Sequence, residues 1–160
     1  TCHEARKMKE FTSVGDLLRE IILEPDVVNP RHAVQLASGQ FVVSHGSLDD
    51  SVHRVVIVGA DGRTRQSYGG PPGPALTQLN TPVRIAVDKD GFILVADMNN
   101  RRVLVLSPTL SYVCQLLTPQ HFTQRWHPTR LCIDSSNSRV YIGENECKDN
   151  KWTAGKVTVL

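Results

Sequence analysis

The chain has 160 residues, with 40% apolar and 21% charged residues and a formal net charge of +2. This balance is typical of a globular domain and excludes a disordered chain. A charge of +2 gives no ground for nucleic-acid binding by the chain as a whole, and no apolar run reaches the roughly 18 residues of a membrane span. The sequence begins Thr1-Cys2-His3-Glu4, which lacks an initiator Met and an apolar leader and which we interpret as an internal start. We expect one domain and no membrane partner.

Three segments of the chain align on a proline. They begin at Asn29-Pro30, Thr81-Pro82 and His127-Pro128, and the prolines are roughly 50 residues apart. Each proline is followed by an apolar run, a turn, a second run, a polar loop and a third run headed by a cation. The runs are 29–36, 41–43 and 54–58, then 81–88, 92–95 and 102–106, then 127–134, 140–142 and 156–160.

The runs are short, rich in Val, Ile and Leu, and bounded by Gly, Asp, Asn and Pro, which predicts strands. A fourth, more polar run follows in two units, at 65–68 and 112–116. The helix-like stretch Asp16–Leu23 fits the fourth strand of a preceding unit, which we place at Leu17–Ile22, after a third strand at Lys7–Phe11. Four antiparallel strands in a unit of this length are typical of a β-propeller blade.

The sequence therefore predicts an all-β fold, a single partial propeller over residues 1–160 with about three to three and a half four-stranded antiparallel blades. Known propellers close with four to eight blades, so we expect the missing part of the propeller, or self-association, to cover the open blade faces. The predicted parts are the end of a blade (1–26), two blades (27–74 and 75–121) and a blade lacking its fourth strand (122–160).

The middle unit resembles the NHL repeat. The resemblance is carried by the segments at 79–82, 85–88, 90–97 and 100–103, which read Leu-Asn-Thr-Pro, Ile-Ala-Val-Asp, Asp-Gly-Phe-Ile-Leu-Val-Ala-Asp and Asn-Arg-Arg-Val. A glycine-rich linker at 68–74 also looks like the loop that joins NHL blades. The resemblance implies a six-bladed propeller of which this chain is about the C-terminal half, similar to the propellers of TRIM-NHL proteins.

A cationic or titratable residue stands two positions after each anchor proline, where the NHL pattern usually has glycine: His32, Arg84 and Arg130. In a propeller this position faces the mouth of the central channel, and arginine forks there suit phosphates or carboxylates. The alternative is that Arg84 and Arg130 pair with strand-end acids such as Asp88 or Asp134 and brace the blade. Three neighbours would enlarge the ligand-binding patch: Arg31, His127 and Trp126.

A second pair, Asp97 and Arg102, stands across the loop between a second and a third strand. Because Arg54 and Lys156 occupy the matching position in the other units, we interpret the pair as structural. The polar loops at 44–52 and 144–155 are the variable parts, where function usually lies in a propeller. Their carboxylates lack a regular ligand spacing, so we expect no metal.

The four cysteines form no C-x-x-C pair. Cys114 and Cys132 have apolar neighbours, and we predict that both are buried as small hydrophobic residues. Cys2 and Cys147 would lie in loops of non-adjacent blades, farther apart than the ~6 Å between Cα atoms that a disulfide allows. We therefore expect free thiols and a cytoplasmic location.

No Gly-x-Ser-x-Gly, His-Glu-x-x-His or phosphate-loop motif is present, so we predict a non-catalytic recognition or scaffold module without a cofactor. A protein partner is favoured over RNA because the formal charge is low. The resemblance implies the substrate-recruiting part of a TRIM-like ubiquitin ligase. The alternatives are an RNA-binding propeller in post-transcriptional regulation, a lyase or hydrolase that uses the channel mouth, and a secreted receptor with disulfides.

Overall fold

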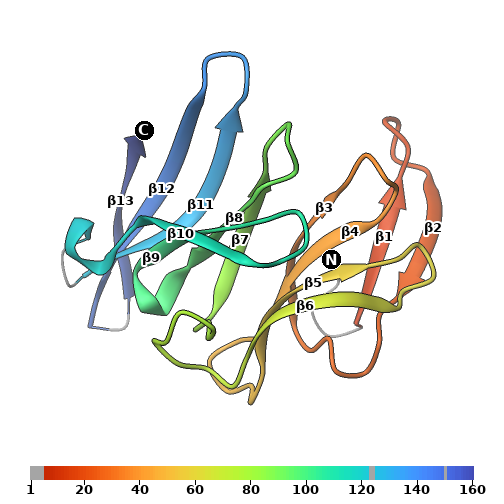
Figure 1. Ribbon diagram of the computed structural model, residues 1–160, viewed down its shortest axis with the longest axis horizontal. Helices are drawn as coiled ribbons and strands as arrows, with labels where there is room; N and C mark the ends of the chain where they lie inside the picture. The colour runs from red at the N-terminus through yellow and green to blue at the C-terminus, as the bar shows by residue number, and fades with distance from the viewer. Residues whose placement is uncertain (1–5, 123–124, 150) are drawn as a thin grey trace.

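The computed structural model describes residues 6–122, 125–149 and 151–160, which form an all-β arrangement of consecutive antiparallel sheets (Figure 1). The first sheet pairs β1 (Lys7–Phe11) with β2 (Leu17–Ile22). The second contains β3 (Pro30–Gln35), β4 (Phe41–His45), β5 (His53–Val58) and β6 (Thr64–Gly70). The third contains β7 (Pro82–Val87), β8 (Ile93–Asp97), β9 (Arg102–Leu106) and β10 (Tyr112–Leu117). The last contains β11 (Trp126–Asp134), β12 (Arg139–Lys148) and β13 (Lys151–Val159).

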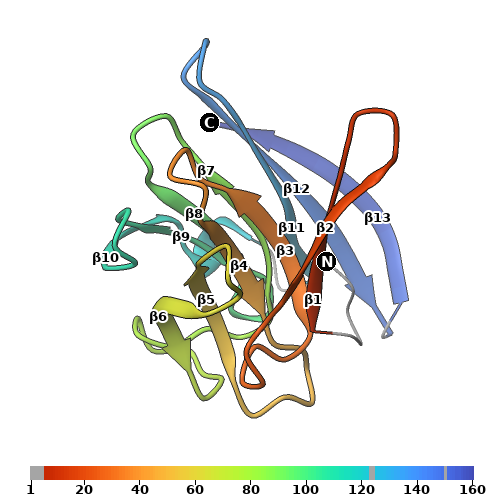
Figure 2. The ribbon, with the colours of Figure 1, turned by 90° about the vertical axis from the view of Figure 1, so that its right-hand side faces the viewer.

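Neighbouring strands in each sheet follow one another in the sequence, as in propeller blades. The sheets succeed one another along an arc from β1–β2 to β11–β13, and Figure 2 shows the same arc from its β1–β2 end. The first strands β3, β7 and β11 pack side by side. The prediction of an all-β, propeller-type fold is confirmed, including strands at 7–11 and 17–22. Short 3₁₀ helices η2 (Met98–Asn100) and η3 (Pro119–His121) lie between strands.

The sheets pack face to face because the apolar residues of the middle strands alternate between two cores. In β5, Val55 and Ile57 belong to the core shared with the β7–β10 sheet, whereas Val56 and Val58 belong to the core shared with β1–β2. Successive side chains of a strand point to opposite faces, so a continuous apolar run serves a blade that is covered on both sides. A third core joins the last two sheets around Phe122 and Ile142.

Two predictions about the chain are wrong. The segment 144–155 is not a loop, because β12 and β13 continue as a paired hairpin, with Cys147 opposite Trp152 and Lys148 opposite Lys151. Cys114 and Cys132 are exposed rather than buried. Since Leu131 and Ile133 face the third core, the alternation of the strand turns Cys132 to the other face. Cys114 lies on the outer strand β10, which is exposed at this end. Cys2 lies outside the described residues.

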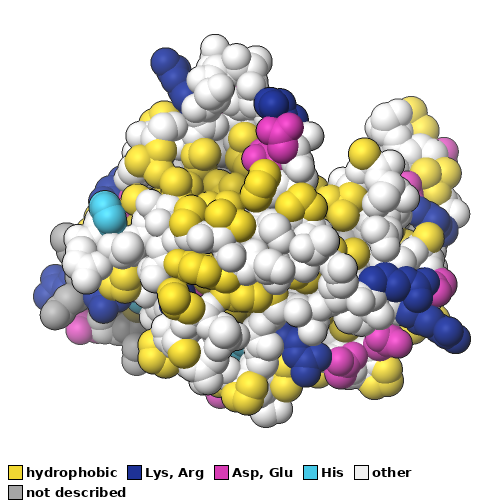
Figure 3. Space-filling model, viewed as in Figure 1, with side chains coloured by type: hydrophobic (Ala, Val, Ile, Leu, Met, Phe, Trp, Pro, Cys, Tyr) yellow, Lys and Arg dark blue, Asp and Glu magenta, His cyan; other side chains and the backbone are white. Residues whose placement is uncertain are grey.

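The two ends of the arc expose large apolar side chains. Leu18 and Ile22 of β2 are exposed at one end, and Val157 and Val159 of β13 at the other. Figure 3 shows apolar side chains gathered over one face, with most charged groups toward its margins. Self-association or completion by further blades stays a prediction, consistent with these exposed surfaces. No helix in the described part of the chain is long and apolar enough to cross a membrane.

Candidate functional site

A β-bulge follows the anchor proline in each of the three inner strands. In β3, Pro30 pairs with His45 and His32 with Ser44, so Arg31 is an extra residue in the ladder. The same irregularity occurs after Pro82 and after Pro128. The repeat therefore places equivalent side chains at one level of three adjacent blades: His32, Arg84 and Arg130, together with the bulged residues Arg31, Val83 and Thr129.

These strands surround a cleft of about 620 Å³. Arg31, Arg84 and Arg130 line it from three successive blades. A second cleft of about 390 Å³ lies between β1–β2 and the next sheet, and His32 lines it. Since Arg31 and Arg84 line both clefts, the two clefts adjoin at these side chains, and we refer to them together as the groove across the inner strands. The candidate residues His32, Arg84 and Arg130 are thus brought together.

The residue opposite each of these positions is small. Ser44 pairs with His32, Ala96 with Arg84, and Gly143 with Arg130. A Cβ atom added to Gly143 would lie 2.8 Å from the Cβ atom of Arg130, closer than such atoms approach one another. Small residues at this point of the second strand therefore leave room for the large cations beside them.

The groove concentrates positive charge without a matching acid at its centre. Among the described residues that line the larger cleft there is no Asp or Glu. Burial lowers the pKa of Arg84, and the nearby charge of Arg130 lowers it further. Burial, with the charges of Arg84 and Arg130, lowers the pKa of His32 to about 4, so this imidazole is neutral at pH 7. The arrangement suits an oxyanion ligand, which would compensate the arginine charges.

The alternative pairing of these arginines with strand-end acids is wrong within the described chain. Asp88 accepts hydrogen bonds from the backbone N–H groups of Asp90 and Phe92 in its own turn. Asp134 likewise accepts hydrogen bonds from Ser136 and Asn137. Arg130 instead donates Nη1–H to the Thr129 carbonyl oxygen at 2.8 Å.

Of the aromatic candidates, Trp126 does not line the cleft. The Lys156 ammonium lies over its ring, with Nζ 4.9 Å from the ring centroid. Trp152 of β13 lines the cleft instead. His127 makes an edge contact with Trp152 at 5.8 Å between ring centroids, and its Nδ1 lies 3.0 Å from the Met98 carbonyl oxygen. Sequence reasoning missed Trp152 because it placed the residue in a loop.

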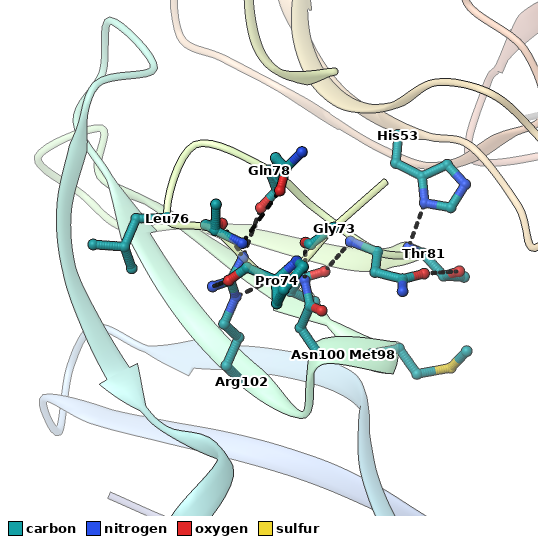
Figure 4. A network of polar contacts seen from close by, with 12 residues as sticks. His53, Gly73, Pro74, Leu76, Gln78, Thr81, Met98, Asn100 and Arg102 are labelled. Atoms are coloured by element: carbon teal, nitrogen blue, oxygen red, sulfur yellow. Dashed lines mark hydrogen bonds and ion pairs between the residues drawn. The ribbon is translucent and has the colours of Figure 1, made fainter. Parts of the chain in front are cut away.

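Asp97 and Arg102 form a buried ion pair, with Arg102 Nε 2.7 Å from Asp97 Oδ2. Arg102 also donates to the carbonyl oxygens of Pro74, Ala75 and Gln78, which fixes the interblade linker (Figure 4). Asn100 bridges Asp97 and the Gly73 carbonyl. Burial raises the pKa of Asp97, whereas hydrogen bonds from the Asn80 backbone and Asn100 and the charge of Arg102 lower it. The pair therefore holds the linker at 73–78 against the β7–β10 sheet.

His53 joins two blades at the edge of the same cleft. Its Nδ1 accepts the Thr81 backbone N–H at 2.9 Å, so its Nε2 carries the proton and donates to the Ser47 carbonyl oxygen at 2.7 Å. Ser47 and Thr81 both line the cleft. This fully buried histidine therefore sets the distance between two of its walls.

His45 occupies the position that Asp97 and Glu144 hold in the other blades, opposite a cation of the third strand, which is Arg54, Arg102 or Lys156. Arg54 pairs with Asp26 instead, at 2.9 Å. The His45 ring is fully buried, and neither nitrogen makes a hydrogen bond of ordinary geometry to a described residue. Burial, together with the charge of Arg54, lowers the pKa of His45 to about 4, although Asp26 and Asp50 oppose the shift.

We expect the stability of the fold to decrease on acidification because of His45. Between pH 6.5 and 4 the unfolded chain binds a proton at this residue that the folded chain does not, so the free energy of unfolding falls as the pH falls. At about 1.4 kcal/mol per pH unit, the loss reaches at most about 3 kcal/mol. Urea unfolding of His45→Gln at several pH values should show a shallower dependence. His121→Gln, at an exposed position, is the control and should keep the original slope.

Within the described ranges, no group of three or more His, Cys, Asp or Glu side chains is placed to hold a metal ion.

Comparison with known proteins places the sequence and the fold in context. Residues 79–106 match the family model described as NHL repeat. The mouse protein E3 ubiquitin-protein ligase TRIM71 is 29% identical over 123 residues, which cover 62% of this chain and 14% of that protein. The chain thus spans a small part of this relative.

The solved structures that resemble the chain share its fold at low sequence identity. Virginiamycin B lyase from Staphylococcus aureus has a TM-score of 0.63 at 14% identity, over 100% of this chain and 50% of the lyase. Its catalytically inactive form with quinupristin gives 0.64 at 16% identity, with the same coverage. A Bacteroides caccae protein of unknown function gives 0.53 at 14% identity, over 95% of this chain and 54% of that one. The chain therefore corresponds to about half the length of these propeller-like structures.

Proposed function

We propose that this chain, which belongs to the NHL-repeat β-propellers, is a non-catalytic recognition module that binds a protein partner in the cleft between its inner strands. The observation that carries the proposal is the set of three arginines from successive blades, which line a cleft of about 620 Å³ in which no described lining residue is acidic. Recognition sites are concave and carry few, well-placed polar groups among apolar ones. This cleft has that composition.

The similarity to a mouse E3 ubiquitin-protein ligase supports a more specific proposal. In it, the chain is the substrate-recruiting part of a TRIM-like ubiquitin ligase, and the transfer of ubiquitin belongs to another part of that protein. A cationic cleft beside an exposed indole also favours RNA as the second candidate ligand, because bases stack on aromatic rings and phosphates bind arginine. The formal net charge of only +2 favours protein over RNA.

The test is crosslinking followed by immunoprecipitation of the whole protein, with protein and RNA recovered side by side. We expect protein crosslinks near Arg84 and Arg130, and their loss in the double variant Arg84→Glu/Arg130→Glu, because reversal of two charges repels an anionic partner. The matched control is Arg65→Glu/Lys89→Glu, which reverses two exposed charges outside the cleft. Unchanged crosslinks in the cleft variant, with folding verified by circular dichroism, would move the site elsewhere. Recovery of RNA alone would favour the second candidate.

A further inference from the structure

The cleft has an apolar part as well as a cationic part. Trp152 and Leu48 line it and remain 54% and 71% exposed, although large apolar side chains are usually withdrawn from water. Val83 and Met98 line the same cleft from β7 and η2. Exposed apolar groups that line one concave site mark the place of an apolar ligand group. The ligand therefore needs an apolar group close to its oxyanion.

The form of the site fits an extended ligand. The larger cleft adjoins the smaller one at Arg31 and Arg84, and the groove formed by the two therefore extends from β13 past β11, β7 and β3 toward β1. Its far part contains the apolar residues Met8, Ile21 and Phe41, together with one cation and one acid, Lys9 and Glu10. A strand of RNA carries a phosphate at every nucleotide, and the apolar residues of this part offer those phosphates no partner. A peptide that alternates acidic and apolar side chains meets both kinds of wall with matching groups.

We infer that the groove binds an extended acidic peptide, with one carboxylate between Arg84 and Arg130 and a neighbouring apolar side chain packed against Trp152 and Leu48. This inference rests on the proposed function, since it specifies the partner segment that the module recognises. Arg84 and Arg130 carry like charges in the same cleft, and one carboxylate between them offsets their repulsion and accepts hydrogen bonds from both guanidinium groups. Such charge-assisted bonds are roughly twice as strong as neutral ones.

The experiment measures fluorescence anisotropy of labelled probes with the whole 160-residue chain. The probes are a ten-residue peptide that alternates Leu and Glu, the same peptide with Gln for Glu, the same peptide with Ala for Leu, and a ten-nucleotide oligouridine. We expect the Leu–Glu peptide to bind and the Gln peptide to bind at least about tenfold more weakly, since charge-assisted hydrogen bonds are lost. The variant Arg84→Gln/Arg130→Gln should weaken binding of the Leu–Glu peptide by a similar factor. Its affinity for the Gln peptide should stay unchanged.

The apolar contact has its own variant. Trp152→Ala should weaken binding of the Leu–Glu peptide but not of the peptide with Ala for Leu. Only the Leu–Glu peptide places a large apolar group on the indole. If the Glu and Gln peptides bound equally well and both lost binding with Trp152→Ala, the inference of an acidic peptide would be overturned. The proposal of protein recognition at the cleft would stand. Tighter binding of oligouridine than of any peptide would overturn both proposals. Failure of every peptide to bind at millimolar concentration would overturn the inference as well.

Discussion

Arg102→Ala is expected to lower the free energy of unfolding by about 3–5 kcal/mol, because it leaves the carboxylate of Asp97 buried without its counter-ion. Asp97 is fully buried and Arg102 is 3% exposed. The substitution also leaves the carbonyl oxygens of Pro74, Ala75 and Gln78 without their guanidinium donor. Urea unfolding followed by circular dichroism measures the effect.

The control is Arg65→Ala, which breaks the exposed ion pair with Asp61 at 2.7 Å. Exposed pairs contribute about 0–1 kcal/mol, so this variant should stay close to wild type. Arg102→Lys should fall between the two, since an ammonium group keeps the charge but cannot reach four acceptors in a planar arrangement. Equal stability of the Arg102→Ala and Arg65→Ala proteins would contradict a structural role for the buried pair.

Gly62→Ala is expected to cost at least about 3 kcal/mol and to loosen the β1–β2 sheet from its neighbour. Gly62 has a φ of +81°, and a Cβ atom there would lie 1.8 Å from the Ile22 carbonyl oxygen. The backbone of the β5–β6 turn therefore touches the end of β2, and an added methyl group must push the two apart. Hydrogen exchange of the β1 and β2 amides, measured beside global unfolding, should become faster.

Gly39 provides a matched control, because it has the same φ of +81° but no atom within 4 Å of an added Cβ. Gly39→Ala carries only the backbone cost of a left-handed alanine, about 1–2 kcal/mol. The difference between the two variants isolates the contact between the turn and Ile22. If both variants lost the same stability, the contact with β2 would contribute nothing.

Much of the fold could be predicted from the sequence, because apolar runs bounded by Gly, Asp, Asn and Pro define short strands. The strands at 7–11, 17–22 and 102–106 match the structure in both bounds. The hairpin over 144–155 could not be predicted in this way, since its residues are polar and its strand character comes from pairing between β12 and β13. The exposure of Cys132 depends on which face of β11 meets the core, which its apolar neighbours alone did not reveal.

The positions of the candidate residues could be predicted in part. The repeat placed His32, Arg84 and Arg130 at one level, because equivalent positions in successive blades have equivalent orientations. The partners of these side chains could not be predicted from the sequence. Asp88 and Asp134 could equally have paired with an arginine or accepted hydrogen bonds within their own turns. Trp152 was missed because its contribution to the cleft depends on the length of the β12–β13 hairpin. The small residues Ser44, Ala96 and Gly143 were a signal that the sequence did contain.

The bulge after each anchor proline separates two tasks within one strand. The bulged residues have no Cα partner in the strand register, yet all three of them line the cleft: Arg31, Val83 and Thr129. A bulged residue has no Cα partner in the register of the strand pair, so a substitution there leaves the neighbouring pairs of the ladder in register. New ligand preferences can therefore evolve blade by blade at these three positions, while the residues that determine the register of the sheets remain under independent selection.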